Sequence, residues 1–328
     1  PQSIMKNILL TGGAGYIGSH VVEALIKKKK RVYVIDDLST GSKILINNKA
    51  HFYKLNILEK KKIKKIIINN KIDSVIHLAG SLIIEVGEKF PERYHRNNVI
   101  GTKSILSACQ NTSVKNFIFS STAAVYKDKQ KIVHENSKIE PKSVYGKTKI
   151  KAEKLVISNC KKTKINYAIL RYFNVCGASP SGKIGLISKT DSLFKNISSA
   201  IMNKKPIVNI YGNNYKTQDG TTIRDYVHVS DLAEAHFKIL IKISKINKSL
   251  ILNCGYNRGI SVNDVVNEFK KQSNKKIQIF YKNRRPGDLA IVIASNKKLK
   301  KTINWKPKYL KLREIVKSCI KWEETINR

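Results

Sequence analysis

Short apolar runs and longer amphipathic segments alternate through the first half of the chain. The apolar runs predict strands over residues 7–11, 31–36, 51–54, 73–79, 115–121 and 166–172, and the amphipathic segments predict helices over residues 16–29, 59–70, 96–111 and 144–161. Strands that are apolar on both faces are typical of a sheet covered by helices on each side. The alternation therefore predicts an α/β fold built on a parallel sheet.

The pattern becomes irregular after residue 174. Glycine, proline and serine gather between residues 177 and 185, and the later apolar segments are short and separated by turns rich in asparagine and lysine. We expect a smaller, mixed α/β substrate domain here. The predicted domains are residues 5–174, which bind NAD, and residues 175–328, with room for some later strands to pass back into the first domain.

A glycine-rich turn follows the first predicted strand. Gly12, Gly15 and Gly18 stand where the backbone must turn tightly and approach a pyrophosphate, which the free amides of the next helix can bind. The second predicted strand ends in Asp36, whose carboxylate can accept a hydrogen bond from a ribose 2′-hydroxyl. No Lys or Arg follows Asp36 until Lys43, so NAD is expected rather than NADP. Together these features predict a Rossmann-type doubly wound sheet.

Lysine dominates the charge of the chain. The 328 residues carry 63 Lys and Arg against 23 Asp and Glu, which gives a formal net charge of +40. Dense positive charge can bind nucleic acid or an acidic membrane, but most of these residues are lysines spread along the whole chain. Near Ile63, Ile66 and Ile67, for example, the isoleucines recur at helical spacing and lysines fill the opposite face. We therefore interpret the charge as solvated surface and expect no specific nucleic-acid partner.

The cysteines and the length of the apolar runs narrow the class further. The five cysteines are odd in number and include no C-x-x-C pair, which argues against a disulfide framework or a zinc site. No apolar run approaches the roughly 20 residues that a membrane helix needs. We expect a cytoplasmic protein with no bound metal and no membrane partner.

Candidate chemistry lies at the end of the fifth predicted strand and in the helix that follows it. The strand runs into Thr122, and Tyr145 and Lys149 lie one helical turn apart on a shared face. A lysine ammonium near a phenol stabilises the phenolate and lowers its pKa. Tyr145 can then act as a general base that takes a proton from a hydroxyl while hydride leaves the same carbon. The Tyr-x-x-x-Lys spacing is common by chance, but its place after a dinucleotide loop favours the functional interpretation.

Motifs along the chain resemble the extended short-chain dehydrogenase/reductase family, and within it the members that act on nucleotide sugars. The motifs are TGGAGYIGSH (11–20), HLAG (77–80), NNVIGT (97–102), KNFIFSSTAAVY (115–126), YGKTK (145–149), LRYFNVCGA (170–178), DGTTIRDYVHVSDLA (219–233) and RRPGD (284–288). They follow one another in the order of the family. The RDYVHV-x-DL block, together with RYFN, is the part most specific to the nucleotide-sugar members.

The resemblance implies a role for individual positions. Thr122, Tyr145 and Lys149 are implied to be catalytic. The implied NAD-binding residues are Gly12, Gly15, Tyr16, Ile17, Gly18, Asp36, Asn56, Ile57, Leu78, Ala79, Gly80, Asn97, Tyr145, Lys149 and Phe173. The implied contacts with a UDP-sugar are Thr122, Asn174, Leu193, Tyr211, Arg224, Arg285, Asp288 and Val292.

The resemblance implies an NAD-dependent 4-epimerase that interconverts UDP-glucose and UDP-galactose through a transient 4-keto intermediate. Tyr145 is implied to take the proton of the sugar 4-hydroxyl while hydride passes from C4 to NAD and later returns to the other face. Asn56 stands where the family has an acid for the adenine amine, although its side-chain oxygen can still accept. Val292 stands where the family gates the space near the sugar C2. A small residue there implies activity on the N-acetyl forms as well.

Three alternatives stay open. A UDP-sugar dehydratase or decarboxylase fits the same fold, but Ala123 and Ala124 supply no acid or base for an elimination. The positive charge leaves a non-catalytic NAD-binding protein associated with polyanions as the second, and a dehydrogenase that releases NADH is the third. The expected partners are a UDP-hexose substrate and, by the resemblance, a second copy of the chain paired through the helices 96–111 and 144–161.

Overall fold

The chain folds into two compact units. The computed structural model describes residues 6–127, 131–188, 192–285 and 288–327. The first unit comprises Pro1–Tyr126, Lys138–Tyr172 and Ala233–Leu252, and the second comprises Lys127–Ser137, Phe173–Leu232 and Asn253–Arg328. The chain therefore returns to its first unit after it has begun the second.

A seven-stranded sheet forms the centre of the first unit. Its strands are β1 (Asn7–Thr11), β2 (Arg31–Asp36), β3 (His51–Lys54), β4 (Ser74–His77), β5 (Asn116–Thr122), β7 (Asn166–Tyr172) and β11 (Leu250–Cys254), in the order β11-β7-β5-β4-β1-β2-β3. Strand β1 pairs in parallel with β2 and β4, and the pairs β2–β3, β4–β5 and β5–β7 are parallel too. The strand order reverses between β1 and β4, where doubly wound sheets bind their ligands. The predicted Rossmann-type sheet is confirmed.

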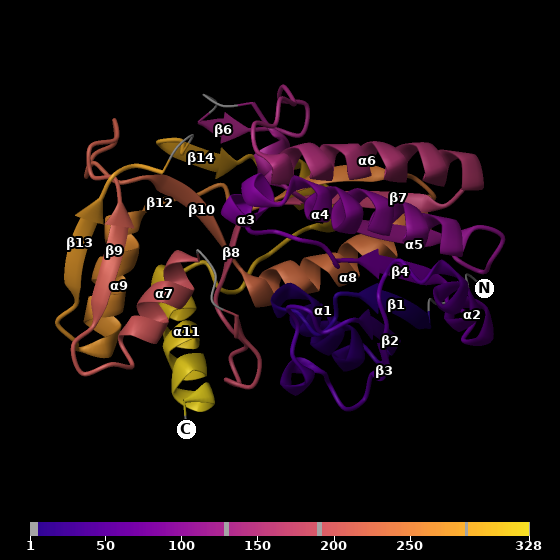
Figure 1. Ribbon diagram of the computed structural model, residues 1–328, viewed down its shortest axis with the longest axis horizontal. Coiled ribbons are helices and arrows are strands. Elements are labelled where there is room, and N and C mark those ends of the chain that lie inside the picture. Colours follow the sequence, from indigo (N-terminus) through magenta and orange to yellow (C-terminus); the bar gives the residue numbers. More distant parts are fainter. Residues whose placement is uncertain (1–5, 128–130, 189–191, 286–287, 328) are drawn as a thin grey trace. The chain divides into compact units, whose positions relative to one another are not determined.

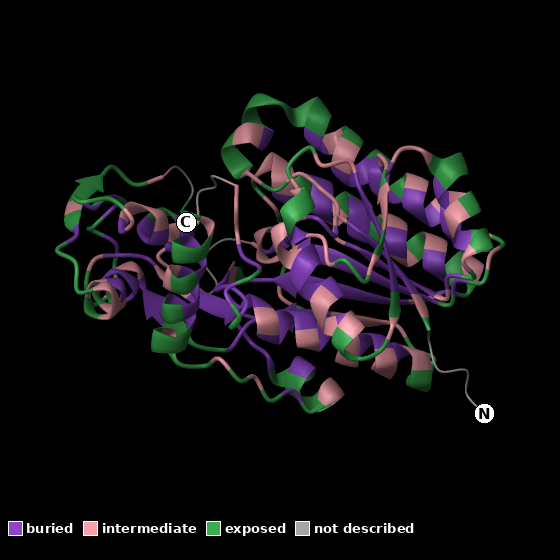
Figure 2. Cartoon of the chain, turned by 90° about the horizontal axis from the view of Figure 1, so that it is seen from below, coloured by how far each residue is buried: buried purple, intermediate pink, exposed green. Residues whose placement is uncertain are grey.

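Helices cover both faces of this sheet (Figure 1). The helices α2 (Lys60–Asn69), α5 (Gly101–Cys109) and α6 (Val144–Thr163) share one face, and α1 (Tyr16–Lys27) and α8 (Val229–Ile246) lie on the other. Figure 2 shows buried strands between helices whose outward surfaces are exposed. The predicted strands and helices agree with the observed ones to within one or two residues at each end, with the exceptions that follow.

The predicted helix over 96–111 is not one regular helix. It consists of a π-helical segment, η2 (Arg96–Ile100), followed by α5, and two short helices precede it, α3 (Ile84–Lys89) and α4 (Pro91–His95). A π-helical turn is often found near functional sites. Here it carries Asn97, one of the predicted NAD contacts.

The expectation that apolar segments are short after residue 174 is wrong for α8. This helix of 18 residues buries Leu232, Ile239, Leu240 and Ile243 on one side. Lys238, Lys242 and Lys245 interrupt its apolar positions, which recur at helical spacing. With β11, α8 returns the chain to the first unit.

The second unit combines small sheets with helices. One sheet has the order β12 (Gly259–Ser261), β10 (Ile223–His228), β14 (Ile291–Ala294) and β6 (Ile132–Val133), and β8 (Asn174–Cys176) also pairs with β10. The strands β9 (Ile207–Tyr211) and β13 (Gln278–Lys282) form a two-stranded parallel sheet. The remaining helices are α7 (Leu193–Ala200), α9 (Val262–Ser273), α10 (Lys297–Ile303) and α11 (Leu312–Ile326), and two 3₁₀ turns are η1 (Lys43–Leu45) and η3 (Ala123–Val125) in the first unit.

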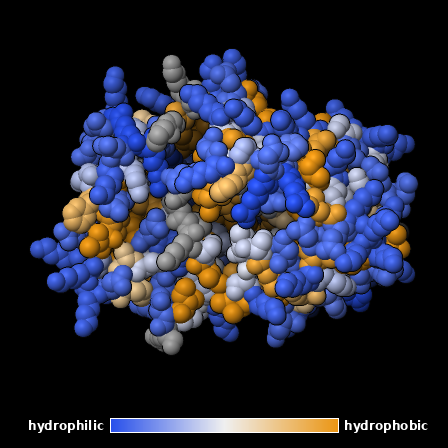
Figure 3. All heavy atoms as spheres, in the orientation of Figure 1, coloured by the Kyte–Doolittle hydropathy of each residue, from blue (hydrophilic) through white to orange (hydrophobic). Residues whose placement is uncertain are grey.

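The visible surface of the protein is mostly hydrophilic. Figure 3 shows hydrophilic residues over most of the visible face, with hydrophobic residues in small groups between them. Across the part of the chain that the structure describes, no helix combines the length and the apolar character needed to cross a bilayer.

Candidate active site

The glycine-rich turn lies between β1 and α1 and depends on close backbone approach. Gly12 has a φ of +74°, and a Cβ there would lie 2.7 Å from the amide nitrogen of Ala79. A Cβ on Gly18 would overlap the carbonyl oxygen of Gly12. Gly15 is the N-cap of α1, so no cap side chain competes for the amides of the first turn, which can bind an anion. The predicted contacts Tyr16 and Ile17 are the first two residues of that helix.

Asp36 lies at the end of β2, close to this turn. Its Oδ2 accepts from the amide of Ala14 at 3.0 Å and its Oδ1 from the amide of Leu38 at 2.9 Å. Burial raises the pKa of Asp36, and the two backbone hydrogen bonds act against that rise. Each carboxylate oxygen accepts more than one hydrogen bond, so capacity remains for ribose hydroxyls.

Asn56 forms a pair with Asp37. Its Nδ2 donates to Asp37 Oδ2 at 2.7 Å, and its Oδ1 accepts from the amide of Leu58 at 3.0 Å. Burial acts to raise the pKa of Asp37, but hydrogen bonds from Ser39 and Asn56 outweigh it and hold the pKa below its usual value. An ionised carboxylate therefore lies beside the position that lacks the expected acid. Ile57, the next residue, is buried in the hydrophobic core.

The loop Leu78–Gly80 follows β4 at the same edge of the sheet. A Cβ on its glycine would lie 2.9 Å from Asn98 Oδ1, so the backbone comes this close to the Asn98 amide only because the position is glycine. Asn97 Nδ2 donates to Ser81 Oγ at 2.9 Å, which ties η2 to this loop.

The structure brings Thr122, Tyr145 and Lys149 together where β5 ends and α6 begins. Ser143 caps α6 by accepting from the amide of Gly146 at 3.1 Å, which places Tyr145 in the first turn of the helix. Lys149 follows one turn later and is only 5% exposed. A side-chain hydrogen bond joins Thr122 to Tyr145.

The hydrogen bonds around these side chains define their roles. Thr122 Oγ1 accepts from the amide of Ala124 at 3.1 Å, which leaves its hydroxyl proton for the phenol of Tyr145. Lys149 Nζ donates to the carbonyl oxygen of Ser120 at 2.7 Å. The predicted proton-transfer groups are therefore held by contacts within the first unit.

The expected lowering of the Tyr145 pKa is wrong, because burial has the opposite effect. Burial raises the pKa of Tyr145 to about 12, although the hydrogen bond with Thr122 acts in the other direction. Burial also lowers the pKa of Lys149 to about 8, and the charge of Glu153 acts against that fall. The sequence shows only that the lysine and the phenol share a helix face, not that both lie out of water, where desolvation dominates.

Five predicted substrate contacts of the second unit lie near one another. Arg224 on β10 forms an ion pair with Asp288, and it is the register partner of Val292 on β14. The Arg285 guanidinium lies over the ring of Tyr211, 4.4 Å from its centre. Two arginines and a carboxylate of this kind can bind a diphosphate and a ribose hydroxyl.

The remaining predicted contacts of the second unit are more scattered. Phe173 is buried, and its amide donates to the carbonyl oxygen of Cys254 at 3.2 Å. Asn174 is exposed on β8, opposite Tyr226 of β10. Leu193 is half-buried at the first position of α7.

Sequence reasoning missed two sets of residues. Tyr215 is buried in the second unit beneath the guanidinium of Arg284, 4.2 Å from its ring centre, and its hydroxyl bonds to none of the described residues. In the first unit, Glu153 and Arg171 form a buried ion pair beside Lys149. The available signal was spacing, because Glu153 continues the helix face of Tyr145 and Lys149 by one more turn.

Comparison with known proteins identifies the family. Residues 8–255 match the NAD dependent epimerase/dehydratase family. A UDP-glucose 4-epimerase from Lactobacillus helveticus is 37% identical over 320 residues, 97% of this chain and 97% of that protein. A crystal structure of UDP-glucose-4-epimerase from Stenotrophomonas maltophila, with bound NAD and formylated UDP-arabinopyranose, has a TM-score of 0.95 at 29% identity and covers 98% of this chain and 99% of that chain. The UDP-Glc/GlcNAc 4-epimerase from Campylobacter jejuni has a TM-score of 0.85 at 34% identity, covering 98% and 99%.

The chain therefore belongs to the NAD dependent epimerase/dehydratase family. The resemblance drawn from the motifs is confirmed, and NAD is the cofactor of the family.

Proposed function

We propose that this chain is an NAD-dependent 4-epimerase that interconverts UDP-glucose and UDP-galactose. The observation that carries the proposal is the grouping of Thr122, Tyr145 and Lys149 at the edge of the sheet, where Thr122 bonds to Tyr145 and Lys149 is held by the carbonyl oxygen of Ser120. Similarity to UDP-glucose 4-epimerases over nearly the whole chain supports it.

The residues of the first unit fit NAD. The turn around Gly12 and Gly18 leaves no room for side chains, as close approach to a pyrophosphate requires. Asp36 keeps acceptor capacity for the adenosine ribose, and the pair of Asp37 and Asn56 offers acceptors for the adenine amine. When bound, NAD supplies the hydride acceptor and a positive charge that favours a phenolate nearby.

The side chains of this chain then divide the work of proton transfer. Tyr145 takes the proton of the sugar 4-hydroxyl and returns it when the alcohol re-forms. Thr122 donates to the phenol oxygen and thereby stabilises its charged form. Lys149 contributes a positive charge one turn away, and Ser120 fixes its position through the carbonyl oxygen.

The second unit supplies the proposed binding site of the nucleotide sugar. Arg224 and Arg285 would neutralise the diphosphate, and Asp288 would accept from a ribose hydroxyl. Phe173, Asn174, Leu193 and Tyr211 are the further contacts that we propose.

The test is an assay without added cofactor. The purified protein should release bound NAD on denaturation and convert UDP-galactose to an isomer of unchanged mass, with no net build-up of NADH. A product lighter by one water would indicate a dehydratase, and loss of carbon dioxide a decarboxylase. Retention on polyanion columns in moderate salt, without turnover, would favour the non-catalytic alternative.

Val292 supports a wider substrate range. It is the register partner of Arg224, so it lies next to the proposed diphosphate contact, and it is smaller than an aromatic residue. We propose that UDP-N-acetylglucosamine is also a substrate, a range that the name of the Campylobacter jejuni relative supports.

We also propose a cytoplasmic homodimer. The five cysteines are free and buried, which suits a reducing compartment. The helices α5 and α6 pack together on one face of the first unit, where two copies could form a four-helix interface. Sedimentation at micromolar concentration tests the dimer.

A further inference from the structure

The core between α6 and the sheet changes from apolar to polar residues at the edge of the sheet. On this face β5 and β7 contribute apolar rows that end with Phe119 and Ile169. The next inward positions are Ser121 and Arg171, which are register partners. Glu153 of α6 meets them where an apolar residue would continue the core. A polar group of three thus closes the end of an apolar core.

These three side chains are fully engaged with one another. Arg171 Nε donates to Glu153 Oε1 at 2.9 Å, and Arg171 Nη2 donates to Glu153 Oε2 at 2.7 Å. Ser121 Oγ donates to Glu153 Oε1 at 2.5 Å, and Arg171 Nη1 donates to the hydroxyl of Tyr126 at 3.0 Å. Glu153 is 1% exposed and Arg171 3%. Burying two ions has a desolvation penalty that offsets much of the electrostatic attraction between them. A gain in folding stability therefore does not by itself account for this pair.

The cluster is connected to all three proposed catalytic side chains. Glu153 follows Lys149 by one helical turn, on the helix that also carries Tyr145. Ser121 directly precedes Thr122 in β5. We propose that Glu153, Arg171 and Ser121 form a positioning cluster, which holds the strand end against the helix and keeps Lys149 charged; this rests on the proposed function.

The electrostatic part of the proposal concerns the Lys149 ammonium. The titratable and charged groups around it are Tyr145 and Glu153 on α6, His77 on β4, Arg171 on β7 and, beyond the phenol, Tyr94 on α4. Burial keeps His77 neutral, with a pKa lowered to about 3. Among these groups Glu153 supplies the negative charge that opposes loss of the lysine proton. Without it, Lys149 should lose its proton at a lower pH.

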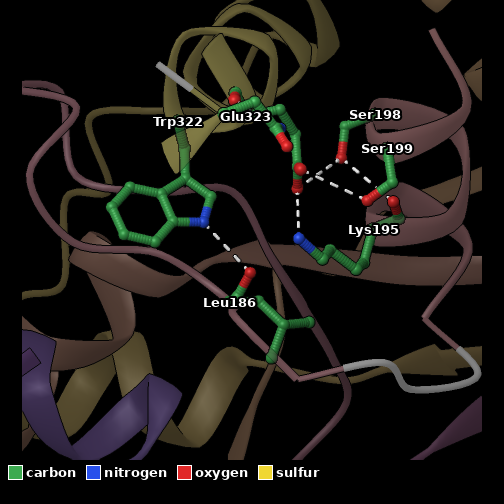
Figure 4. A network of polar contacts seen from close by, with 7 residues as sticks. Leu186, Lys195, Ser198, Ser199, Trp322 and Glu323 are labelled. Atoms are coloured by element: carbon green, nitrogen blue, oxygen red, sulfur yellow. Dashed lines mark hydrogen bonds and ion pairs between the residues drawn. The ribbon is translucent and has the colours of Figure 1, made fainter. Parts of the chain in front are cut away.

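A second buried ion pair provides a matched control. Figure 4 shows Lys195 of α7 with its Nζ 2.5 Å from Glu323 Oε1 of α11, and Ser198 and Ser199 also donate to Glu323. The pair is also buried, with Lys195 9% and Glu323 2% exposed. It belongs to the second unit, whereas Lys149 belongs to the first. Loss of its carboxylate should affect folding but not Lys149.

The kinetic experiment compares Glu153→Gln with Glu323→Gln. Glu153→Gln should lower kcat about 10-fold at neutral pH with KM for UDP-galactose nearly unchanged, and should move the alkaline limb of the kcat profile down by about one pH unit. Glu153→Asp should recover part of both. Glu323→Gln should leave the alkaline limb where wild type has it. An unmoved limb in Glu153→Gln overturns the proposal.

A stability titration gives a readout without turnover. Because the folded pKa of Lys149, about 8, lies below its unfolded value, the free energy of unfolding should rise with pH above about 8. Lys149→Met should remove that rise, and Glu153→Gln should make it begin at a lower pH. If Glu153→Gln does not fold, Glu153→Gln with Arg171→Met leaves no unpaired buried charge and should show the same direction. A rise that begins at the wild-type pH contradicts the cluster, whereas absent epimerase activity in wild type contradicts the proposed function only.

Discussion

The candidate groups of the two units are held in different ways. In the first unit Thr122, Tyr145 and Lys149 are fixed by buried hydrogen bonds between a strand end and a helix. In the second unit Arg224 is paired with Asp288, a group proposed to bind the same ligand. The first set is thus held in place by the protein itself, whereas the role proposed for the second requires it to exchange partners when a ligand binds.

This difference follows from where the side chains start. The first set projects from a parallel sheet and a helix of 20 residues, whose positions the core determines. In the second set Arg224 comes from β10, an inner strand of a small sheet, whereas its partner Asp288 lies outside the strands and is exposed. Groups on rigid elements suit chemistry, which depends on geometry. A partly exposed ion pair suits binding, because a charged ligand can replace one of its two partners.

The largest expected effect is on the set held by hydrogen bonds in the first unit. Tyr145→Phe removes the proposed base and should lower kcat about 1,000-fold, since general base catalysis contributes on that order. KM and bound NAD should stay close to wild type. Tyr167→Phe removes a phenol hydroxyl from β7 of the same unit and should change kcat little. Equal losses in the two variants would show that the effect on kcat is structural.

The second largest effect is expected for Arg224, which we propose exchanges Asp288 for the ligand in the second unit. Arg224→Gln should raise KM for UDP-galactose about 30-fold or more, with kcat within a few-fold of wild type, because a charge-assisted contact to phosphate is lost. The freed Asp288 carboxylate would also repel the diphosphate. Arg224→Gln with Asp288→Asn should therefore recover part of the KM. A fall in kcat at unchanged KM would mean that Arg224 acts on the chemistry, and the contrast between the units would fail.

Local patterns in the sequence predicted the sheet and the spacing of its chemistry. The apolar runs gave six strands of the first unit, and the positions of Tyr145 and Lys149 on one helix face follow from helical geometry. Helical spacing places Glu153 on the same face as Tyr145 and Lys149, but it gives no sign of Arg171, because charged residues at separate points of the chain read as surface. Their partnership exists only once β7 lies beside β5. The raised pKa of Tyr145 likewise depends on burial, which spacing does not reveal.

A third effect is an opposite response of the two units to acid. His77 in the first unit is buried between Thr11 and Thr102 with a pKa lowered to about 3, so its stabilising contribution is lost as pH falls below about 6.5. Asp225 in the second unit accepts from the amides of Tyr256, Asn257 and Ala294, and burial raises its pKa to about 6. Its contribution is present at low pH and is lost as pH rises through 6.

Hydrogen exchange between pH 7 and 4.5 separates these responses. After correction for intrinsic rates, acid should weaken protection around β4 and strengthen it around β10, each by about 2 kcal/mol. His77→Gln should remove the response of the first unit and leave that of the second. Parallel loss of protection in both units would mean that other groups govern their acid response.

The smallest effect concerns which sugar the second unit accepts. Val292 lies next to Arg224 across β10 and β14, so a ring at position 292 would take space beside the proposed diphosphate contact. Val292→Tyr should lower kcat/KM for UDP-N-acetylglucosamine about 10-fold relative to UDP-glucose, since steric discrimination in a pocket is on that order. Val292→Ile adds one methylene and should shift the ratio much less. Because Val292 supplies no group for proton transfer, turnover of UDP-glucose should stay within a few-fold of wild type, as expected if binding and chemistry are divided between the two units. An unchanged ratio in Val292→Tyr would place the determinant of the C2 substituent elsewhere in the second unit.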